Sequence, residues 1–292
     1  MIRRALNWLN KRRLAAKQAR LQAGGPALKV LLFHGIYDEE AGPCSDAVDP
    51  SLAVSLGWVE QCLTETQQQG FRFIHPKELP NALLSSERLA LLTLDDGYAN
   101  NLLLLPLLNR LQVPALLFVT TDSLLRGRSY WWDVLARNTA DAAQLSVKRR
   151  ALKKLRPREI EQHLMQDLGE RCFNPRGDHD RPMTPEELRE FARQPLIGIG
   201  NHTHHHALLD QCHPDEALDE LSRCGLELEK LLGSRPTTLA YPNGRWNQAT
   251  ERAAKLAGIT AAFTTERLLA PLPLRPSRHL SIPRLQPLPA SS

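Results

Sequence analysis

An apolar run that ends in two adjacent acids is the first feature of this 292-residue sequence that could do chemistry. The stretch LTLDDGYAN places Asp95 and Asp96 directly before Gly97. Neighbouring carboxylates repel each other, so an ordinary strand end would more often carry a single Asp, Asn or Ser. Successive strand side chains point to opposite faces, but a glycine lets the backbone turn, and both acids can then reach one pocket. A bound cation would offset their repulsion, with one acid as its ligand and the other free to accept a proton.

A run of histidines supplies the other half of such a site. In GNHTHHHALL, His202 and His206 stand four residues apart where the pattern predicts a strand to end. Neutral imidazole is a common zinc ligand. Two imidazoles with one carboxylate leave coordination positions open for water and substrate, as a catalytic zinc site requires. His204 or His205 could be the true ligand instead, and the whole run could equally be a surface tract.

Short apolar strands that alternate with helical stretches must position these residues. Strands are predicted at LKVLLFHG, FRFIHP, RLALLTLDDG, VPALLFVTT, PLIGIGNHTHHHALL, PTTLAYPNG and ITAAFTT. Helices are predicted at residues 51–70, 101–111, 212–233 and 247–258, a helix-leaning insertion at about 122–194, and a mostly loop-like tail from residue 270. This alternation predicts a parallel sheet, open or closed into a barrel, with functional groups at the carboxyl ends of its strands.

Three motifs make the sequence resemble the polysaccharide deacetylases of carbohydrate esterase family 4. They are TLDDG at 93–97, NHTHHH at 201–206 and AYPNG at 240–244, in the family's order. LLFH and SYWWDVL resemble features of the branch whose chains open with a strand ending in histidine. The resemblance implies an α/β fold, an irregular (β/α) barrel with fewer strands than the eight-stranded kind. Residues 28–292 would form one barrel domain with the helical insertion, after a basic N-terminal helix at 1–27.

The same resemblance implies how the site works. It makes Asp95 the general base, and it makes Asp96, His202 and His206 the ligands of Zn²⁺ or another divalent transition metal. Such an ion acidifies water, whose proton Asp95 would accept before the attack on an acetyl carbonyl. The ion and a backbone N–H near Tyr241 would stabilise the oxyanion.

The general acid that protonates the leaving amine has two candidates. Many family members use a histidine near the C-terminus, and His279 in SRHLSIPRL is the only one in that region, although its apolar frame is poor. His34 follows a buried strand and should reach the pocket, so the sequence favours His34. Alternatively, His34 is a strand-end histidine with no role.

The third motif departs from the family pattern. Better-known members carry an arginine two residues before its proline, which orients the base, and Ala240 stands there instead. Arg284 in IPRL or Arg245 could substitute, and Arg284 is preferred. If neither does, the base would be poorly oriented.

Other residues are candidates for contact with the sugar. Tyr241, Asn243 and Trp246, with Arg284, are assigned to binding or orienting the substrate. Tyr130, Trp131 and Trp132 could stack on sugar rings, or they could anchor a loop or the core. The basic run VKRRALKKLRPRE within the insertion is expected to be a solvated helix face rather than a binding patch.

Composition narrows the partners and the location. The formal net charge is +5, and no acidic residue precedes Asp38. No basic patch is interleaved with aromatics, so nucleic-acid binding is not expected. The chain lacks a secretory signal and a membrane-spanning run, which predicts a cytoplasmic protein. Ile2, Leu6 and Leu9 could share a helical face that rests on the inner membrane, or this helix could pack on the body of the protein.

These observations predict a metal-dependent hydrolase that removes acetyl groups from an amino sugar in a polysaccharide or glycolipid. Three alternatives stay open. They are an O-acetyl esterase on the same site, a glycan-binding protein that kept the barrel but lost catalysis, and a hydrolase of a non-sugar amide.

Overall fold

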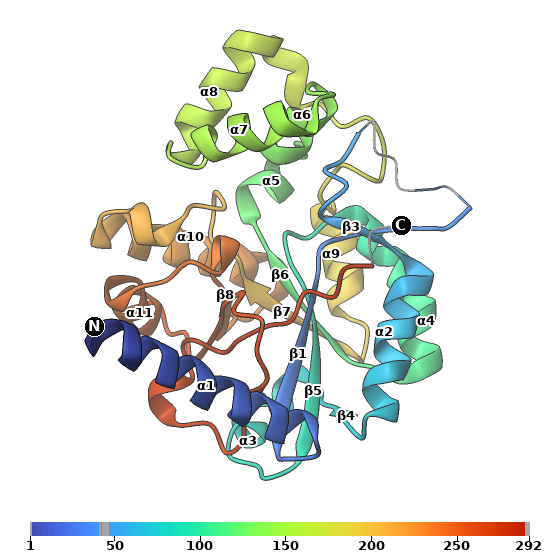
Figure 1. The fold of residues 1–292 in the computed structure, drawn as a ribbon. Coiled ribbons are helices and arrows are strands. Elements are labelled where there is room, and N and C mark those ends of the chain that lie inside the picture. Colours follow the sequence, from blue (N-terminus) through green and yellow to red (C-terminus); the bar gives the residue numbers. More distant parts are fainter. Residues whose placement is uncertain (1, 41, 43–46, 290–292) are drawn as a thin grey trace.

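Parallel strands with helices around them make up the computed structural model, which describes residues 2–40, 42 and 47–289 (Figure 1). Side chains are described from residue 11 onwards. The predicted apolar face of Ile2, Leu6 and Leu9 therefore lies outside the described side chains.

The strands form one large sheet and one small one. They are β1 (Ala27–Phe33), β2 (Gly35–Tyr37), β3 (Ala53–Ser55), β4 (Arg72–Phe73), β5 (Arg88–Leu94), β6 (Ala115–Val119), β7 (Ile197–Asn201), β8 (Thr238–Ala240), β9 (Ala261–Phe263) and β10 (Ala270–Pro271). In the large sheet the order is β10-β1-β5-β6-β7-β8-β9, with β4 beside β5, and only the pairing of β10 with β1 is antiparallel. The predicted parallel α/β architecture is confirmed.

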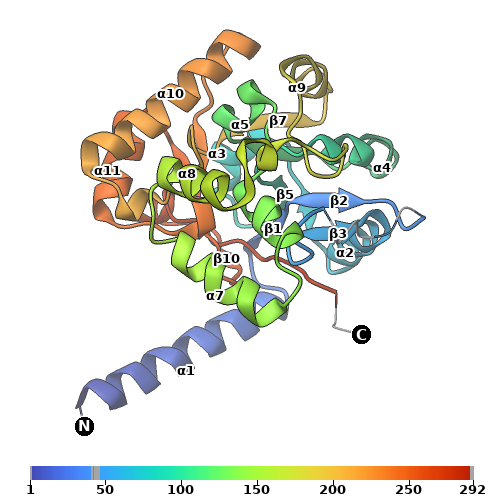
Figure 2. The same ribbon diagram turned by 90° about the horizontal axis from the view of Figure 1, so that it is seen from above.

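Helices surround this sheet (Figures 1 and 2). They are α1 (Ile2–Gln22), α2 (Leu56–Gln68), α3 (Leu79–Ala82), α4 (Leu105–Leu111), α5 (Thr121–Arg126), α6 (Trp131–Arg137), α7 (Ala142–Leu152), α8 (Pro157–Leu168), α9 (Pro185–Ala192), α10 (Pro214–Leu232) and α11 (Gln248–Leu256). Two of them begin later than predicted. Before α2, residues 53–55 pair with β2, and Ser55 then caps the helix. Before α4, residues 99–104 form a 3₁₀ helix, and Pro106 falls in the first turn, where its missing N–H costs nothing.

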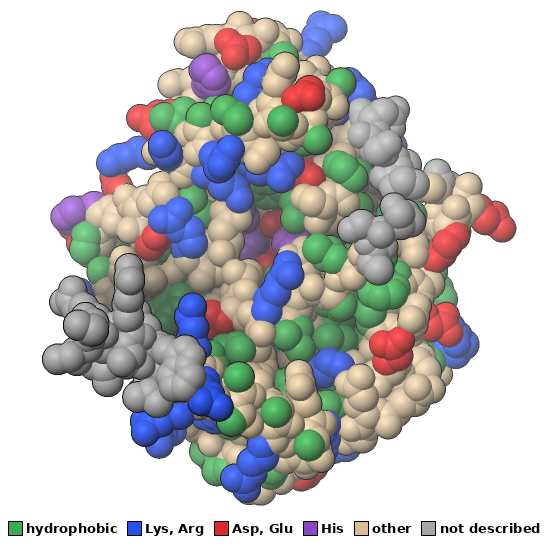
Figure 3. Space-filling model, viewed as in Figure 1, with side chains coloured by type: hydrophobic (Ala, Val, Ile, Leu, Met, Phe, Trp, Pro, Cys, Tyr) green, Lys and Arg blue, Asp and Glu red, His purple; other side chains and the backbone are tan. Residues whose placement is uncertain are grey.

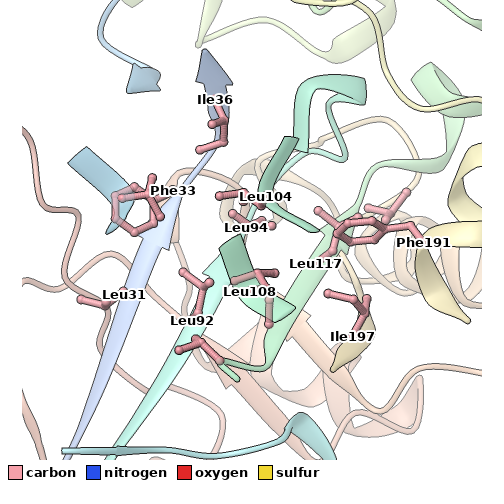
Figure 4. Packing of buried hydrophobic residues seen from close by; sticks show 14 of the residues in the cluster. Leu31, Phe33, Ile36, Leu92, Leu94, Leu104, Leu108, Leu117, Phe191 and Ile197 are labelled. Carbon is pink, nitrogen blue, oxygen red and sulfur yellow. The ribbon is translucent and has the colours of Figure 1, made fainter. Parts of the chain in front are cut away.

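The core lies where the long strands meet the outer helices. Leu92 and Leu94 of β5, Leu117 of β6 and Phe191 of α9 belong to one buried cluster (Figure 4). Nearly every side chain of β5 is buried, as expected for a strand covered on both faces. Since α9 packs into this cluster, the last helix of the predicted insertion belongs to the barrel body.

Helices α6 and α8 have a hydrophobic cluster of their own, which includes Val134, Leu135, Ile160 and Leu164. They sit with α7 over the carboxyl ends of the strands (Figure 1). We call α6, α7 and α8 the cap.

The C-terminal tail closes the barrel between β9 and β1. Ile282 exchanges backbone hydrogen bonds with Ala262 and Thr264 on the β9 side, at 2.8 Å each. Leu285 does the same with Val30 and Leu32 on the β1 side, at 2.7 and 2.8 Å. Arg284 lies between these two contacts, so the seam introduces its side chain into the barrel.

The C-terminal end of α1 is attached to the barrel. Leu21 packs with Phe71 and Leu269, and the Gln18 side chain exchanges hydrogen bonds with the Leu269 backbone. Towards its N-terminus α1 extends away from the body (Figure 2). None of the described helices combines the length and apolar character that a membrane span needs. Contact of α1 with a membrane surface stays a prediction.

Candidate active site

A cavity of about 250 Å³ lies beneath the cap, at the carboxyl ends of the strands. His34 reaches it from the end of β1, and Asp95 and Asp96 from the end of β5. His202 and His206 reach it from the end of β7. Figure 3 shows histidine and acidic side chains inside this hollow. Parallel strands bring these ends together although the residues are far apart in the sequence.

Unusual backbone conformations turn the side chains into the cavity. Asp96 has a φ of 78° and the following Gly97 one of 91°. Thr203 and His206 also have positive φ values, 67° and 55°. Such conformations are costly for residues other than glycine and are frequent at functional sites. Here they place both acids of the DDG triplet on one side of the sheet edge.

Asp96, His202 and His206 together form a group that fits a divalent cation. One ligand atom from each lies within 4.8 Å of the others. Asp96 Oδ1 is 3.4 Å from His202 Nε2 and 3.6 Å from His206 Nε2. This oxygen is buried and has no hydrogen-bond partner among the described residues. A buried carboxylate oxygen without a donor fits a site for a cation.

The ring of His202 is oriented by the barrel. Its Nδ1 lies 2.8 Å from the carbonyl oxygen of Ala240, to which it donates. This bond selects the tautomer whose Nε2 lone pair faces Asp96, the usual arrangement of a metal-binding histidine.

Burial and the charges of neighbouring groups shift the pKa values of Asp96, His202 and His206. Burial would lower the pKa of His202, but the charges of Asp95 and Asp96 outweigh it and raise this pKa. Burial and the nearby His202 lower the pKa of His206 to about 3. Burial would raise the pKa of Asp96, but the close approach of His202 and the charges of the neighbouring histidines outweigh it and lower this pKa. The shifts favour an ionised Asp96 and a neutral His206, the forms in which these two groups can bind a cation.

Asp95 is held by a buried arginine. Arg284 Nη1 and Nη2 each donate to one carboxylate oxygen of Asp95 at 2.7 Å. Arg284 Nε donates to the Thr264 carbonyl oxygen at 3.0 Å. Burial would raise the pKa of Asp95, but the charges of Arg284 and His202 outweigh it and lower this pKa to about 2. Asp95 is therefore ionised, and its position is fixed by a two-point contact.

Comparison with known families identifies the family of the chain. The family model described as polysaccharide deacetylase matches residues 85–262, more than half of the chain. The chain belongs to the polysaccharide deacetylase family. The resemblance predicted from the three motifs is thereby confirmed. Over 88 residues the chain is also 31% identical to "Putative polysaccharide deacetylase YxkH" of Bacillus subtilis (strain 168), a match that covers 30% of this chain and only 31% of that relative.

Solved structures of low sequence identity share the fold. The deacetylase PplD of Streptococcus pyogenes, solved in complex with acetate, has a TM-score of 0.60 and 20% identity, with 90% of this chain and 93% of that chain covered. A de-N-acetylase of Aggregatibacter actinomycetemcomitans has a TM-score of 0.61 and 16% identity, with 88% and 94% covered. IcaB of Ammonifex degensii has a TM-score of 0.60 and 19% identity, with 91% and 94% covered.

Of the two predicted substitutes for the arginine missing from the third motif, Arg284 is the one that contacts Asp95. The alternative, Arg245, is exposed and pairs with Asp210 at 2.6 Å. Ala240 itself is buried and supplies the carbonyl that orients His202.

The two other histidines of the run belong to a second group, with Asp122. His204 Nδ1 lies 2.8 Å from Thr121 Oγ1, and His205 Nδ1 lies 2.6 Å from Glu220 Oε1. His204 and His205 thus do not join the group around Asp96.

The two candidates for the general acid lie in different places. His34 lines the cavity, and its Nδ1 is buried without a hydrogen-bond partner among the described residues. Burial lowers the pKa of His34, although Asp96 and Asp95 oppose the shift. His279 is absent from the cavity lining, and its Nε2 lies 3.2 Å from the Leu274 carbonyl oxygen.

Two predicted substrate contacts lie elsewhere. Trp246 packs against the cluster between α10 and α11 and does not line the cavity. Tyr241 is buried in that cluster, and its N–H already donates to the Phe263 carbonyl oxygen at 3.0 Å, so this amide is not free for an oxyanion. Tyr241 fills the core and Trp246 covers its edge, because both side chains bury large apolar areas. Asn243, in contrast, lines the cavity.

The cap supplies cavity residues that the sequence did not assign to the site. Trp131 and Trp132 line the cavity, and the Trp132 ring lies 4.6 Å from that of His206. Arg149 and Lys153 also line it, although the basic run that contains them was predicted to be a solvated face. Their spacing of four residues on one helical face was the available signal.

Proposed function

We propose that this protein is a divalent-metal-dependent N-deacetylase that acts on an amino sugar. The observation that carries the proposal is the unpartnered Asp96 Oδ1 between His202 and His206, beside an Asp95 that Arg284 holds ionised. Family membership supports deacetylation of a carbohydrate. Two imidazoles and one carboxylate suit Zn²⁺ or another divalent transition metal.

The residues divide the chemistry between them. Asp96, His202 and His206 would hold the ion, which when bound supplies Lewis-acid catalysis and lowers the pKa of water. Asp95 Oδ2 is 3.9 Å from His202 Nε2, so Asp95 stands next to the ligand group and can accept a proton from water there. His34, at the end of the neighbouring strand β1, would donate a proton to the leaving amine.

The two-point contact between Arg284 and Asp95 favours catalysis over a glycan-binding protein without activity. A base without an orienting partner was the reason to consider that alternative. Arg284 supplies the partner, and a buried ion pair of this kind has no evident use in binding a neutral glycan.

The proposal predicts that chelation abolishes turnover. Purified full-length protein is assayed for acetate and free amine from acetylated amino sugars, before and after metal removal. We expect the rate to fall by about 10²-fold or more, because water loses its activating ion, and to recover with zinc. Release of amine distinguishes N-deacetylation from ester hydrolysis. An unchanged rate after complete metal removal would disprove the mechanism.

Zinc content supplies a test that does not depend on turnover. We expect His206→Ala to lose stoichiometric zinc, because it removes one of three ligands. His205→Ala, one residue away in the same run, is the matched control and should retain zinc. Equal retention by both variants would show that the ion is held elsewhere.

We also predict that His34→Gln lowers kcat by about 10²-fold or more, the usual contribution of a general acid. His279→Gln is the control and should stay within about twofold of wild type, since its ring faces the Leu274 carbonyl outside the cavity. Steady-state kinetics on one acetylated sugar, with zinc content checked in each variant, compares the two. A larger loss in the His279 variant would reverse the assignment.

A further inference from the structure

The cap and one loop turn three cations towards the candidate active site. Arg149 and Lys153, at the end of α7, line the cavity, and so does Arg267 in the loop that follows β9. Figure 3 shows Lys and Arg side chains on both sides of the hollow that holds the histidines. We call Arg149, Lys153 and Arg267 the cationic wall. A neutral acetamido sugar would not need it.

Arg149 is held in place by the barrel body. Its guanidinium pairs with Asp49, a buried carboxylate that also accepts hydrogen bonds from the N–H and hydroxyl of Ser51, at 3.0 and 2.7 Å. Arg149 Nε is buried and has no hydrogen-bond partner in the described part of the chain. The side chain is thus preorganised and retains a donor for a ligand.

Lys153 and Arg267 have no carboxylate partner among the residues that the structure describes. Lys153 Nζ donates to the neutral amide oxygen of Asn243 at 3.0 Å, which ties the cap to the third motif. Burial and the nearby charge of Arg149 lower the pKa of Lys153. An anion beside these two cations would offset both effects.

The acids among the described lining residues are too few to neutralise this wall. Asp49 is paired with Arg149, and Asp95 is paired with Arg284. Asp96 is the remaining acid in the lining, and it can offset only one charge of a divalent ion. The cavity therefore keeps a net positive charge whether or not the metal is bound.

We propose that the acylated amino sugar carries a phosphate group, and that the cationic wall binds this phosphate. The inference rests on the proposed deacetylase function and specifies its substrate class. Lys and Arg are the usual phosphate-binding side chains. The charges of Lys153 and Arg267, which no described carboxylate pairs with, match the nearly two negative charges of a phosphate monoester. The group could be the monoester of a soluble sugar phosphate or the diester of a lipid-linked sugar.

Calorimetric titration of full-length, zinc-loaded protein tests this with three probes. They are N-acetylglucosamine 1-phosphate, its methyl phosphodiester, and methyl N-acetylglucosaminide as the neutral compound. We expect at least one phosphate compound to bind about tenfold or more tightly than the neutral one, as charge-assisted hydrogen bonds imply. Tighter binding of the monoester indicates a soluble sugar phosphate, and tighter binding of the diester indicates a lipid-linked sugar.

A charge-neutralised variant assigns the preference to the wall rather than to the zinc ion. In Lys153→Gln/Arg267→Gln the preference for the phosphate compound over the neutral one should fall below about threefold. Few hydrogen bonds to the phosphate group would remain in this variant. The matched control Lys154→Gln/Arg275→Gln loses the same charge from exposed positions outside the lining and should keep the preference. Equal binding of all probes, no binding by any, or a preference that survives in the first variant would overturn the inference. Zinc-dependent deacetylation of neutral sugars would stand in each of those cases.

Discussion

Replacing Asp95 by Asn is expected to lower kcat by about 10²–10⁴-fold, the range for losing a general base, while zinc stays bound. The amide keeps the volume of the carboxylate but cannot accept a proton from water. Zinc stays because Asp96, His202 and His206 are untouched. Single-turnover acetate release, with zinc content measured on the same samples, gives both readouts.

Asp96→Asn is the comparison that separates the roles of the two acids. It should lose zinc as well as activity, because a neutral amide is a poor ligand for a divalent ion. If the Asp95 variant lost zinc and the Asp96 variant kept it, the assignment of base and ligand would be reversed.

Arg284→Met is expected to lower the free energy of unfolding by about 3–5 kcal/mol, because it leaves the Asp95 carboxylate buried without its partner. Both side chains are almost fully buried, with 0% and 3% exposure. Urea denaturation of the metal-free protein measures the change. Arg245→Met, which breaks an exposed pair with Asp210, is the control and should cost about 1 kcal/mol or less.

The double variant Asp95→Asn/Arg284→Met tests whether charge is the cause. It should be more stable than Arg284→Met alone, because no uncompensated charge remains buried. If both proteins unfold at the same urea concentration, lost packing rather than an unpaired carboxylate explains the effect.

Acid titration provides the same test in the unaltered chain. Asp95 has a pKa of about 2 in the folded protein against an ordinary 3.8, so its folded pKa is depressed. Its contribution of about 2 kcal/mol is fully present above pH 3.8 and is lost as the pH falls towards 2. The stability of the wild-type protein should therefore fall more steeply over this interval than that of the double variant.

The sequence by itself determined the strands, the family and the identity of the residues at the strand ends. The apolar runs at 27–33, 88–94 and 115–119 form buried parallel strands, and the first polar side chain after such a strand lies at the sheet edge. The approach of Asp95, Asp96 and His202 follows from this rule, because each stands within two residues of the end of its own strand.

Only the tertiary structure decided which side chains near those ends face the cavity. Positive φ values at Thr203 and His206 separate the four histidines into two groups, and local pattern does not encode such turns. Arg284 meets Asp95 across 189 positions because the tail closes the barrel seam. Likewise, helical periodicity places Arg149 and Lys153 on one face of α7, but the direction of that face depends on how the cap packs over the strands.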